Sequence, residues 1–212
     1  MTNNFIKVAL LIVSLLYSMP TYSNEVINSS VHHLSDGTYA NTSGVAYESS
    51  FNKLLKWSWE RRSKNLETFE FEVEVPNYKE IYENENIVTT WIGHETFLYQ
   101  NKDINVLTDP HFTQRASPLN FAGPKRYMAP GMKIDDLPNI DVVTISHSHY
   151  DHLDYMSVKL LAEKFDNILF LVPLGLKKWF ESKGIYNVRE LDWWDSLITV
   201  SYTHLTLPTN GT

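Results

Sequence analysis

Residues 141–154 read Asp-Val-Val-Thr-Ile-Ser-His-Ser-His-Tyr-Asp-His-Leu-Asp, an apolar run that leads directly into imidazoles and carboxylates. The run from Asp141 to Ser146 has the composition of a buried strand. Three histidines and one aspartate follow within six residues. Chance is a poor explanation, because a chain with this histidine content would contain the pattern in on the order of one case in a thousand. The stretch therefore predicts a sheet with a metal site at the end of one strand.

The spacing of the cluster predicts two metal ions. His147 and His149 alternate along an extended backbone, so both side chains project to one side and can share one ion. Asp151 and His152 follow where the loop turns toward a helix, which places an oxygen and a further imidazole near a second ion. These ligand types suit zinc. We assign the catalytic role to Asp151 and expect metal-assisted hydrolysis, against the alternative of solvated loop histidines.

Strand and helix patterns alternate on both sides of the cluster. Strands are predicted at 87–92, 97–100, 104–108 and 168–172, and helices at 155–165 and 174–183. This order is typical of an α/β layered domain in which strand ends present a site. A loop rich in Pro and Gly, residues 110–138, is too long for a simple connector, and such loops often carry function.

The N-terminal residues carry a predicted sorting signal. Lys7 precedes an apolar run at 8–17, and Pro20 then breaks the run before small residues. We interpret residues 1–23 as a secretory signal peptide and expect an exported, periplasmic protein. A membrane anchor is the alternative, although the run is shorter than the roughly 20 residues that span a bilayer. Residues 24–48 are predicted to be a flexible lead-in, in which His32 and His33 form a solvated pair rather than a ligand set.

Two further segments precede the predicted sheet. Residues 51–64 have the pattern of a basic amphipathic helix, which either packs on the domain core or rests on an anionic membrane surface. Residues 69–75 alternate strictly between apolar side chains and glutamates, which indicates a half-buried extended segment with a solvated acidic face.

The composition excludes some classes of site. Acidic side chains outnumber basic ones by 25 to 18, which argues against a nucleic-acid partner because such grooves need a positive surface. The chain contains no cysteine, so disulfides, thiol nucleophiles and cysteine zinc sites are excluded. A metal ion must therefore bind to His, Asp or Glu.

The ligand cluster matches the signature of the metallo-β-lactamase superfamily. Over residues 51–200 the chain resembles the N-acylphosphatidylethanolamine-hydrolysing phospholipase D family in Trp91–Thr96, Thr108–Pro110, Arg115–Pro118, Gly123–Arg126, Val172–Gly175 and Glu190–Trp194. The resemblance implies an α/β fold, the αββα sandwich of that superfamily. It also implies zinc-dependent cleavage of a phosphodiester in an N-acylated phospholipid. His147 and His149 would bind the first zinc, and Asp151 and His152 the second.

Four residues outside the cluster are candidates for supporting roles. Asp109 either accepts a hydrogen bond that orients a ligand imidazole or caps the turn before Pro110. His94 follows a strand and either hydrogen-bonds to a ligand or is a core histidine, and we favour the core interpretation. Lys125 and Arg126 either contact a substrate phosphate or form a surface pair.

The resemblance extends over only the first half of the expected sandwich. The later ligands of the family, a His, a bridging Asp and a final His, have no counterparts after Val200. We therefore interpret residues 49–200 as a partial domain and residues 201–212 as a non-native tail. The full-length protein is expected to be a hydrolase and the 212-residue chain to be inactive. A lactonase or other ester hydrolase, and an inactive metal-binding fragment, are the alternatives.

The origin of the tail can be tested on DNA. Residues 200–209 read as the translation of a transposase adapter that is widely used in sequencing libraries. Amplification of the locus from source DNA is expected to give a reading frame that diverges after about Thr199 and supplies the missing ligands. Recovery of the same tail from genomic DNA would show that this interpretation is wrong.

Overall fold

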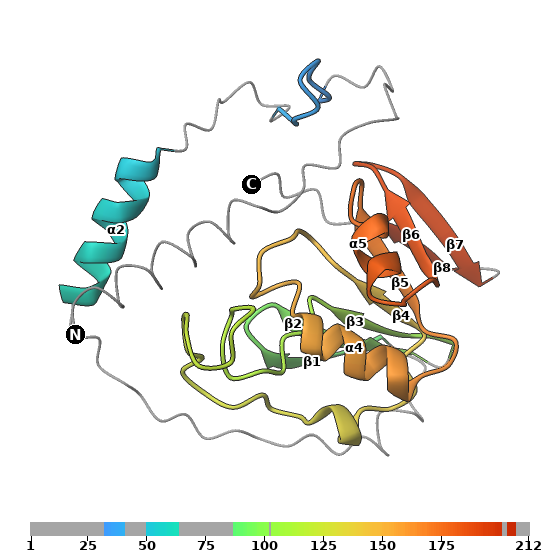
Figure 1. Cartoon of the computed structure of the whole chain (residues 1–212). Coiled ribbons are helices and arrows are strands. Elements are labelled where there is room, and N and C mark those ends of the chain that lie inside the picture. The colour runs from blue at the N-terminus through green and yellow to red at the C-terminus, as the bar shows by residue number, and fades with distance from the viewer. Residues whose placement is uncertain (1–31, 41–49, 64–86, 102, 201–202, 207–212) are drawn as a thin grey trace. The chain divides into compact units, whose positions relative to one another are not determined.

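The computed structural model describes residues 32–40, 50–63, 87–101, 103–200 and 203–206 (Figure 1). The predicted signal peptide and the predicted extended segment at 69–75 lie outside these residues. The chain divides into two compact units, Met1–Tyr47 and Glu48–Thr212. In the first unit, residues 32–40 form a turn that is closed by an isolated bridge between His33 and Tyr39.

A six-stranded sheet is the centre of the second unit. Its strands lie side by side in chain order, and β1 to β3 are antiparallel whereas β3 to β6 are parallel. The strands are β1 (Val88–Gly93), β2 (Thr96–Gln100), β3 (Asn105–Thr108), β4 (Val142–Thr144), β5 (Leu169–Pro173) and β6 (Val188–Leu191). The parallel half matches the prediction that helices connect successive buried strands.

Helices form two of the connections between parallel strands. Helix α4 (Tyr155–Lys164) joins β4 to β5, and α5 (Lys177–Ser182) joins β5 to β6. Both helices lie in front of the sheet in Figure 1. A short 3₁₀ turn, η1 (Ile134–Asp136), is held by Lys164, whose ammonium group donates to the carbonyls of Ile134 and Asp135 at 2.6 and 2.8 Å.

Alternate residues of the parallel strands enter two different apolar clusters, as the two-residue period of a strand requires. Leu107 and Val143 join the larger cluster, which includes Leu161 of α4 and Phe180 of α5. Their neighbours Val106 and Val142 join a second cluster. The sheet is therefore buried on both faces, and this accounts for the continuous apolar runs of its sequence.

A two-stranded sheet follows the main one. It consists of β7 (Ser196–Val200) and β8 (Thr203–Thr206), which pair antiparallel. Leu197 of β7 packs against the second apolar cluster. Strand β8 falls within the tail for which we predict a non-native origin, and that origin stays a prediction.

The predicted strands and helices of the sheet are confirmed, with small shifts of their ends. Helix α5 begins at Lys177 instead of residue 174, because Gly175 has a φ of 90° and interrupts the helical backbone. The sequence did not predict β6. The predicted amphipathic helix is α2 (Phe51–Ser63). Among the described residues, no helix has both the length and the apolar character needed to cross a bilayer.

Two adjacent leucines of α4 test the assignment of the core. Leu161 is fully buried whereas Leu160 is 44% exposed. Leu161→Ala is expected to lower the free energy of unfolding by about 2–5 kcal/mol, because a cavity replaces packed methyl groups. Leu160→Ala, the control on the same helix, is expected to change it by less than about 0.5 kcal/mol. Urea unfolding measures both, and equal effects would contradict this orientation of α4.

Candidate metal centre

One edge of the sheet gathers the polar residues predicted from the sequence. Strands β3 and β4 are parallel, so Asp109 and Ser146 follow strand ends at the same edge. The turn between β1 and β2 reaches this edge too, because β2 is antiparallel to β3 and the amide of Phe97 donates to Thr108 Oγ1 at 3.0 Å. The topology thus brings residues 94, 109 and 146–152 to one site.

The buried carboxylate of Asp109 connects the ends of β3 and β4. Its Oδ1 accepts the backbone N–H of Ser146 at 2.7 Å, and its Oδ2 accepts the Ser146 hydroxyl at 2.6 Å. The same Oδ2 lies 2.8 Å from Nδ1 of His152. Asp109 therefore contacts a predicted ligand in the way that orients an imidazole, which is more than the alternative of a turn cap requires.

These contacts fix which ring nitrogens face the site. The single hydroxyl proton of Ser146 goes to Asp109, so Nδ1 of His147, 3.0 Å from Ser146 Oγ, donates to that oxygen. Nδ1 of His152 donates to Asp109, because an ionised carboxylate can only accept a hydrogen bond. In its neutral form each imidazole then presents an unprotonated Nε2 on the other side of the ring, which is the form that binds a metal ion.

His147 and His149 form the first pair of candidate ligands. Nε2 of His147 lies 2.9 Å from Nδ1 of His149, and the ring centroids are 4.7 Å apart. This distance fits a proton or a cation held between the two nitrogens. The pairing is the one that the alternation in the sequence predicts, and ligation itself stays a prediction.

Asp151 and His152 form the second pair, and His94 joins them. Oδ2 of Asp151 lies 3.6 Å from Nε2 of His152 and 3.0 Å from Nε2 of His94. Within the part of the chain that the structure describes, these three residues are a group whose ligand atoms all lie within 4.8 Å of one another. The core interpretation of His94 is wrong, because 45% of its side chain is exposed.

The surroundings of the cluster shift the pKa values of His147, Asp151 and His152. Burial, with the charges of His152 and His149, lowers the pKa of His147, so this imidazole stays neutral. Burial opposes ionisation of Asp151, but the charge of His152, a backbone N–H and the His94 hydrogen bond outweigh it and lower the pKa of the carboxyl. Burial would also lower the pKa of His152, but the hydrogen bond and charge of Asp109 raise it.

The predicted phosphate-binding residues lie in the long loop. Arg126 donates from Nε to the carbonyl of Met128 at 2.7 Å and from Nη1 to that of His111 at 2.9 Å. The guanidinium thus holds the loop to the residues that follow β3. Lys125 forms an isolated bridge with Arg115. A contact of either side chain with phosphate stays a prediction.

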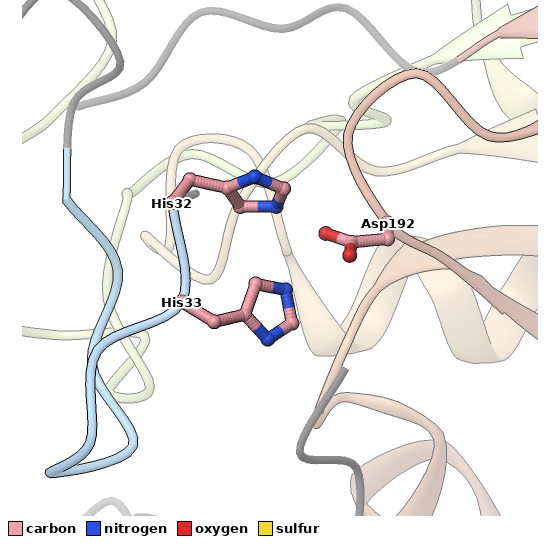
Figure 2. Close-up of side chains that lie close together, drawn as sticks. All are labelled: His32, His33 and Asp192. Atoms are coloured by element: carbon pink, nitrogen blue, oxygen red, sulfur yellow. The ribbon is translucent and has the colours of Figure 1, made fainter. Parts of the chain in front are cut away.

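The histidine pair of the first unit differs from its sequence interpretation. Figure 2 shows both imidazoles on the same side of their turn, with ring centroids 4.6 Å apart in an edge-on arrangement. The ring of Tyr39 lies 5.1 Å from that of His33. The expectation of a solvated pair is wrong for His32, which is buried.

The donor set fits a metal ion. Two imidazole nitrogens in one pair, and an imidazole nitrogen with a carboxylate oxygen in the other, are ligand types that zinc accepts, and co-ligands on a tetrahedral zinc lie about 3.3 Å apart. The measured separations of 2.9 and 3.6 Å lie on either side of that distance. The sheet and this edge therefore define an α/β protein with a candidate metal-binding site.

The comparison with protein families gives the class a name. The sequence model described as a β-lactamase superfamily domain matches residues 104–209, which is half of the chain. The chain belongs to the metallo-β-lactamase superfamily. The α/β fold expected from the resemblance is confirmed by this match and by the sheet.

Curated relatives confirm the resemblance to the phospholipase branch. The chain is 43% identical over 122 residues to N-acyl-phosphatidylethanolamine-hydrolyzing phospholipase D 1 of Caenorhabditis elegans, which covers 55% of this chain and 34% of the relative. It is 35% identical over 111 residues to the mitochondrial enzyme of that name from Saccharomyces cerevisiae, covering 52% of this chain and 23% of the relative. The chain thus spans about a third or less of the length of these relatives.

Solved structures are similar at a lower level. The diiron β-hydroxylase CmlA from Streptomyces venezuelae has a TM-score of 0.43 and 24% identity, over 59% of this chain and 24% of that one. The family assignment rests on the sequence matches and takes nothing from this likeness.

Sequence reasoning missed the role of Ser146. We assigned it only to the end of a strand, whereas its hydroxyl lies between Asp109 and the Nδ1 atoms of His147 and His152, at 3.0 and 3.4 Å. A serine between a buried strand and a ligand histidine carries no signal of its own. Its partner Asp109 lies 37 residues earlier in the chain.

Removal of the Asp109 charge tests this network. Asp109→Asn places an amide where two oxygens accept hydrogen bonds, and it is expected to destabilise the fold by about 1–3 kcal/mol. It is also expected to weaken zinc binding by about 10–100-fold. Urea unfolding and zinc titration measure the two effects, and Asp103→Asn on the surface is the control. An unchanged zinc affinity in Asp109→Asn would contradict the orienting role.

Proposed function

We propose that the protein is a zinc-dependent hydrolase that cleaves a phosphodiester in an N-acylated phospholipid. The observation that carries this proposal is the presence of two ligand pairs, His147 with His149 and Asp151 with His152, at one sheet edge. Relatives that are named for this reaction share 35–43% identity with the chain over about half of its length. The coarser conclusion, membership of the superfamily, does not depend on the substrate.

The residues of this chain would bind and orient two zinc ions. When bound, such ions supply a nucleophile from water at neutral pH and polarise the phosphoryl oxygen. The neutral His147 and the ionised Asp151 match the protonation states of ligands. Asp109 would keep the ring of His152 turned toward the site, because its carboxylate accepts from the opposite ring nitrogen.

The proposed substrate is a membrane lipid, and α2 offers a surface for membrane contact. Leu55, Trp57 and Trp59 of this helix are at least half exposed. Trp side chains are favoured at the boundary between lipid and water, and basic residues of an amphipathic helix are attracted to anionic headgroups. We propose peripheral membrane contact through residues 51–64 in an exported, periplasmic protein.

Zinc content and hydrolysis test the proposal together. The 212-residue chain and the product of the longest reading frame at the locus are each assayed for bound zinc. Both are also assayed for hydrolysis of an N-acylated phospholipid in vesicles and of a lactone panel. Zinc is expected in both, and hydrolysis of the phospholipid is expected in the longer product. His149→Ala is expected to lose zinc and to reduce hydrolysis by at least about 100-fold, whereas Ser148→Ala in the same loop retains both.

Other outcomes would replace this proposal. Turnover of lactones without turnover of the phospholipid would favour the second ester-hydrolase interpretation. Zinc binding without turnover of any substrate would identify a metal-binding protein without catalysis. If wild-type protein retained no zinc, or if His149→Ala kept both zinc and hydrolysis, the metal site itself would be refuted.

A further inference from the structure

The turn between β1 and β2 places His94 by means of an unfavourable backbone. His94 has a φ of 53°, in the left-handed region, and follows Gly93, which has a φ of 144°. For a residue with a side chain this conformation costs about 1–2 kcal/mol. It persists only where the surroundings hold it, and such residues gather at functional sites. The position of the His94 side chain is therefore imposed by its surroundings.

One bond that holds this turn comes from Trp91. The indole Nε1 donates to the carbonyl of His94 at 2.9 Å, and the strand register shifts between Trp91 and Gly93. The Trp91 side chain is 53% exposed, so this hydrogen bond, and not burial of the ring, is its specific contribution to the turn.

The imidazole so placed reaches Asp151, which lies 57 residues later in the chain. Nε2 of His94 is 3.0 Å from Oδ2, within the range of an N–H···O hydrogen bond. The two side chains are 45% and 37% exposed. The contact therefore lies in the open site and is not a by-product of core packing.

The imidazoles of His94 and His152 both flank Asp151, and their distances to its carboxylate indicate different roles. His152 Nε2 lies 3.6 Å from Oδ2, too far for a hydrogen bond but suitable for a ligand of the same ion. The 3.0 Å between His94 Nε2 and Asp151 Oδ2 is the ordinary length of an N–H···O hydrogen bond. It matches a donor that faces the carboxylate. His94 thus holds Asp151, and His152 shares its ion.

We propose that Trp91 and His94 form a positioning device for the second metal ion, in which Trp91 fixes the turn and His94 donates from Nε2 to Asp151. The inference rests on the metal site of the proposed function and deepens it. Neither residue touches the ion. The first pair, His147 and His149, contacts neither Trp91 nor Asp151 through the device. Loss of His94 is therefore expected to lower the affinity for one of the two ions.

Variants of His94 test the donor role by metal binding instead of activity. Zinc is titrated into the full 212-residue chain in competition with a chelator dye. His94→Ala is expected to lower the affinity for one ion by about 10–100-fold and to leave the other unchanged. His94→Gln places an amide N–H where Nε2 lies and is expected to restore affinity to within about threefold, since it replaces the hydrogen bond. Circular dichroism shows whether each variant folds.

Trp91 has a control in Trp194, which is also exposed and lies outside the turn between β1 and β2. Trp91→Phe keeps an aromatic ring and removes the indole donor, and it is expected to lower the affinity for the same ion by about threefold to tenfold. Trp194→Phe is expected to leave both affinities unchanged. Equal effects of the two substitutions would overturn the role of Trp91.

The remaining outcomes decide between this device and its competitors. If His94→Gln is as damaging as His94→Ala, His94 is a ligand and the donor role is refuted. If His94→Ala binds two ions as tightly as wild type, the device has no effect and the inference fails while the proposed function stands. If wild type binds no zinc, both fail. NMR of the imidazole nitrogens adds a readout without metal, in which an unprotonated His94 Nε2 would overturn the proposal.

Discussion

The carboxylate of Asp109 is the constraint on which the site depends. It lies at the end of β3 and accepts from the backbone and the hydroxyl of Ser146 at the end of β4. Two parallel strands are thereby held in register by an interaction beyond their ladder. Hydrogen bonds to a charged acceptor are short and strong, and a buried carboxylate without donors would be costly. The Asp109 carboxylate therefore stabilises both the sheet and the loop of residues 146–152.

The same edge of the sheet contains unfavourable backbone conformations. Asp109 has a φ of 36° and His94 one of 53°, both without the freedom of glycine. The side chain of each contacts the loop of residues 146–152. Asp109 accepts a hydrogen bond from Ser146, and His94 contacts Asp151. Gly93 has a different purpose: a Cβ there would lie 3.1 Å from Nη2 of Arg126, so glycine lets the long loop close over this turn.

The positions of β1 to β5 along the chain and the loop that carries the candidate site could be predicted from the sequence, because both follow from local patterns. The apolar run at 141–146 is β4, and the ligands follow its end. Strand β6 escaped prediction because it is short and contains the exposed Arg189, so it lacks a continuous apolar run. Helix α5 started late because Gly175 overrides the helical period of its neighbours.

Contacts between distant segments could not be predicted, because a single sequence does not give the geometry of a turn. For His94 the strand end that precedes it leaves a core histidine and a hydrogen-bond donor to a ligand as alternatives, and the left-handed backbone turns the ring out to Asp151. Arg126 was considered for phosphate because of its charge, whereas its donors bind the carbonyls of His111 and Met128. Asp151 lies 57 residues after His94, and His111 lies 15 residues before Arg126, so no local periodicity connects these partners.

Burial increases across the site from His94 and Asp151 to His152 and Asp109. Asp151 and His94 have side chains 37% and 45% exposed, whereas those of His152 and Asp109 are 14% and 8% exposed. An ion bound at this edge would be reached from solvent on the side of Asp151. The candidate ligand His152 is hydrogen-bonded to the carboxylate of Asp109, which is almost inaccessible to water. Each candidate pair would supply two ligands, fewer than the four of a tetrahedral zinc, so an ion bound there would need further ligands from water, substrate or other protein atoms. Open positions are what distinguish a catalytic ion from a structural one, and at this edge the exposed side of Asp151 is where solvent would reach a bound ion.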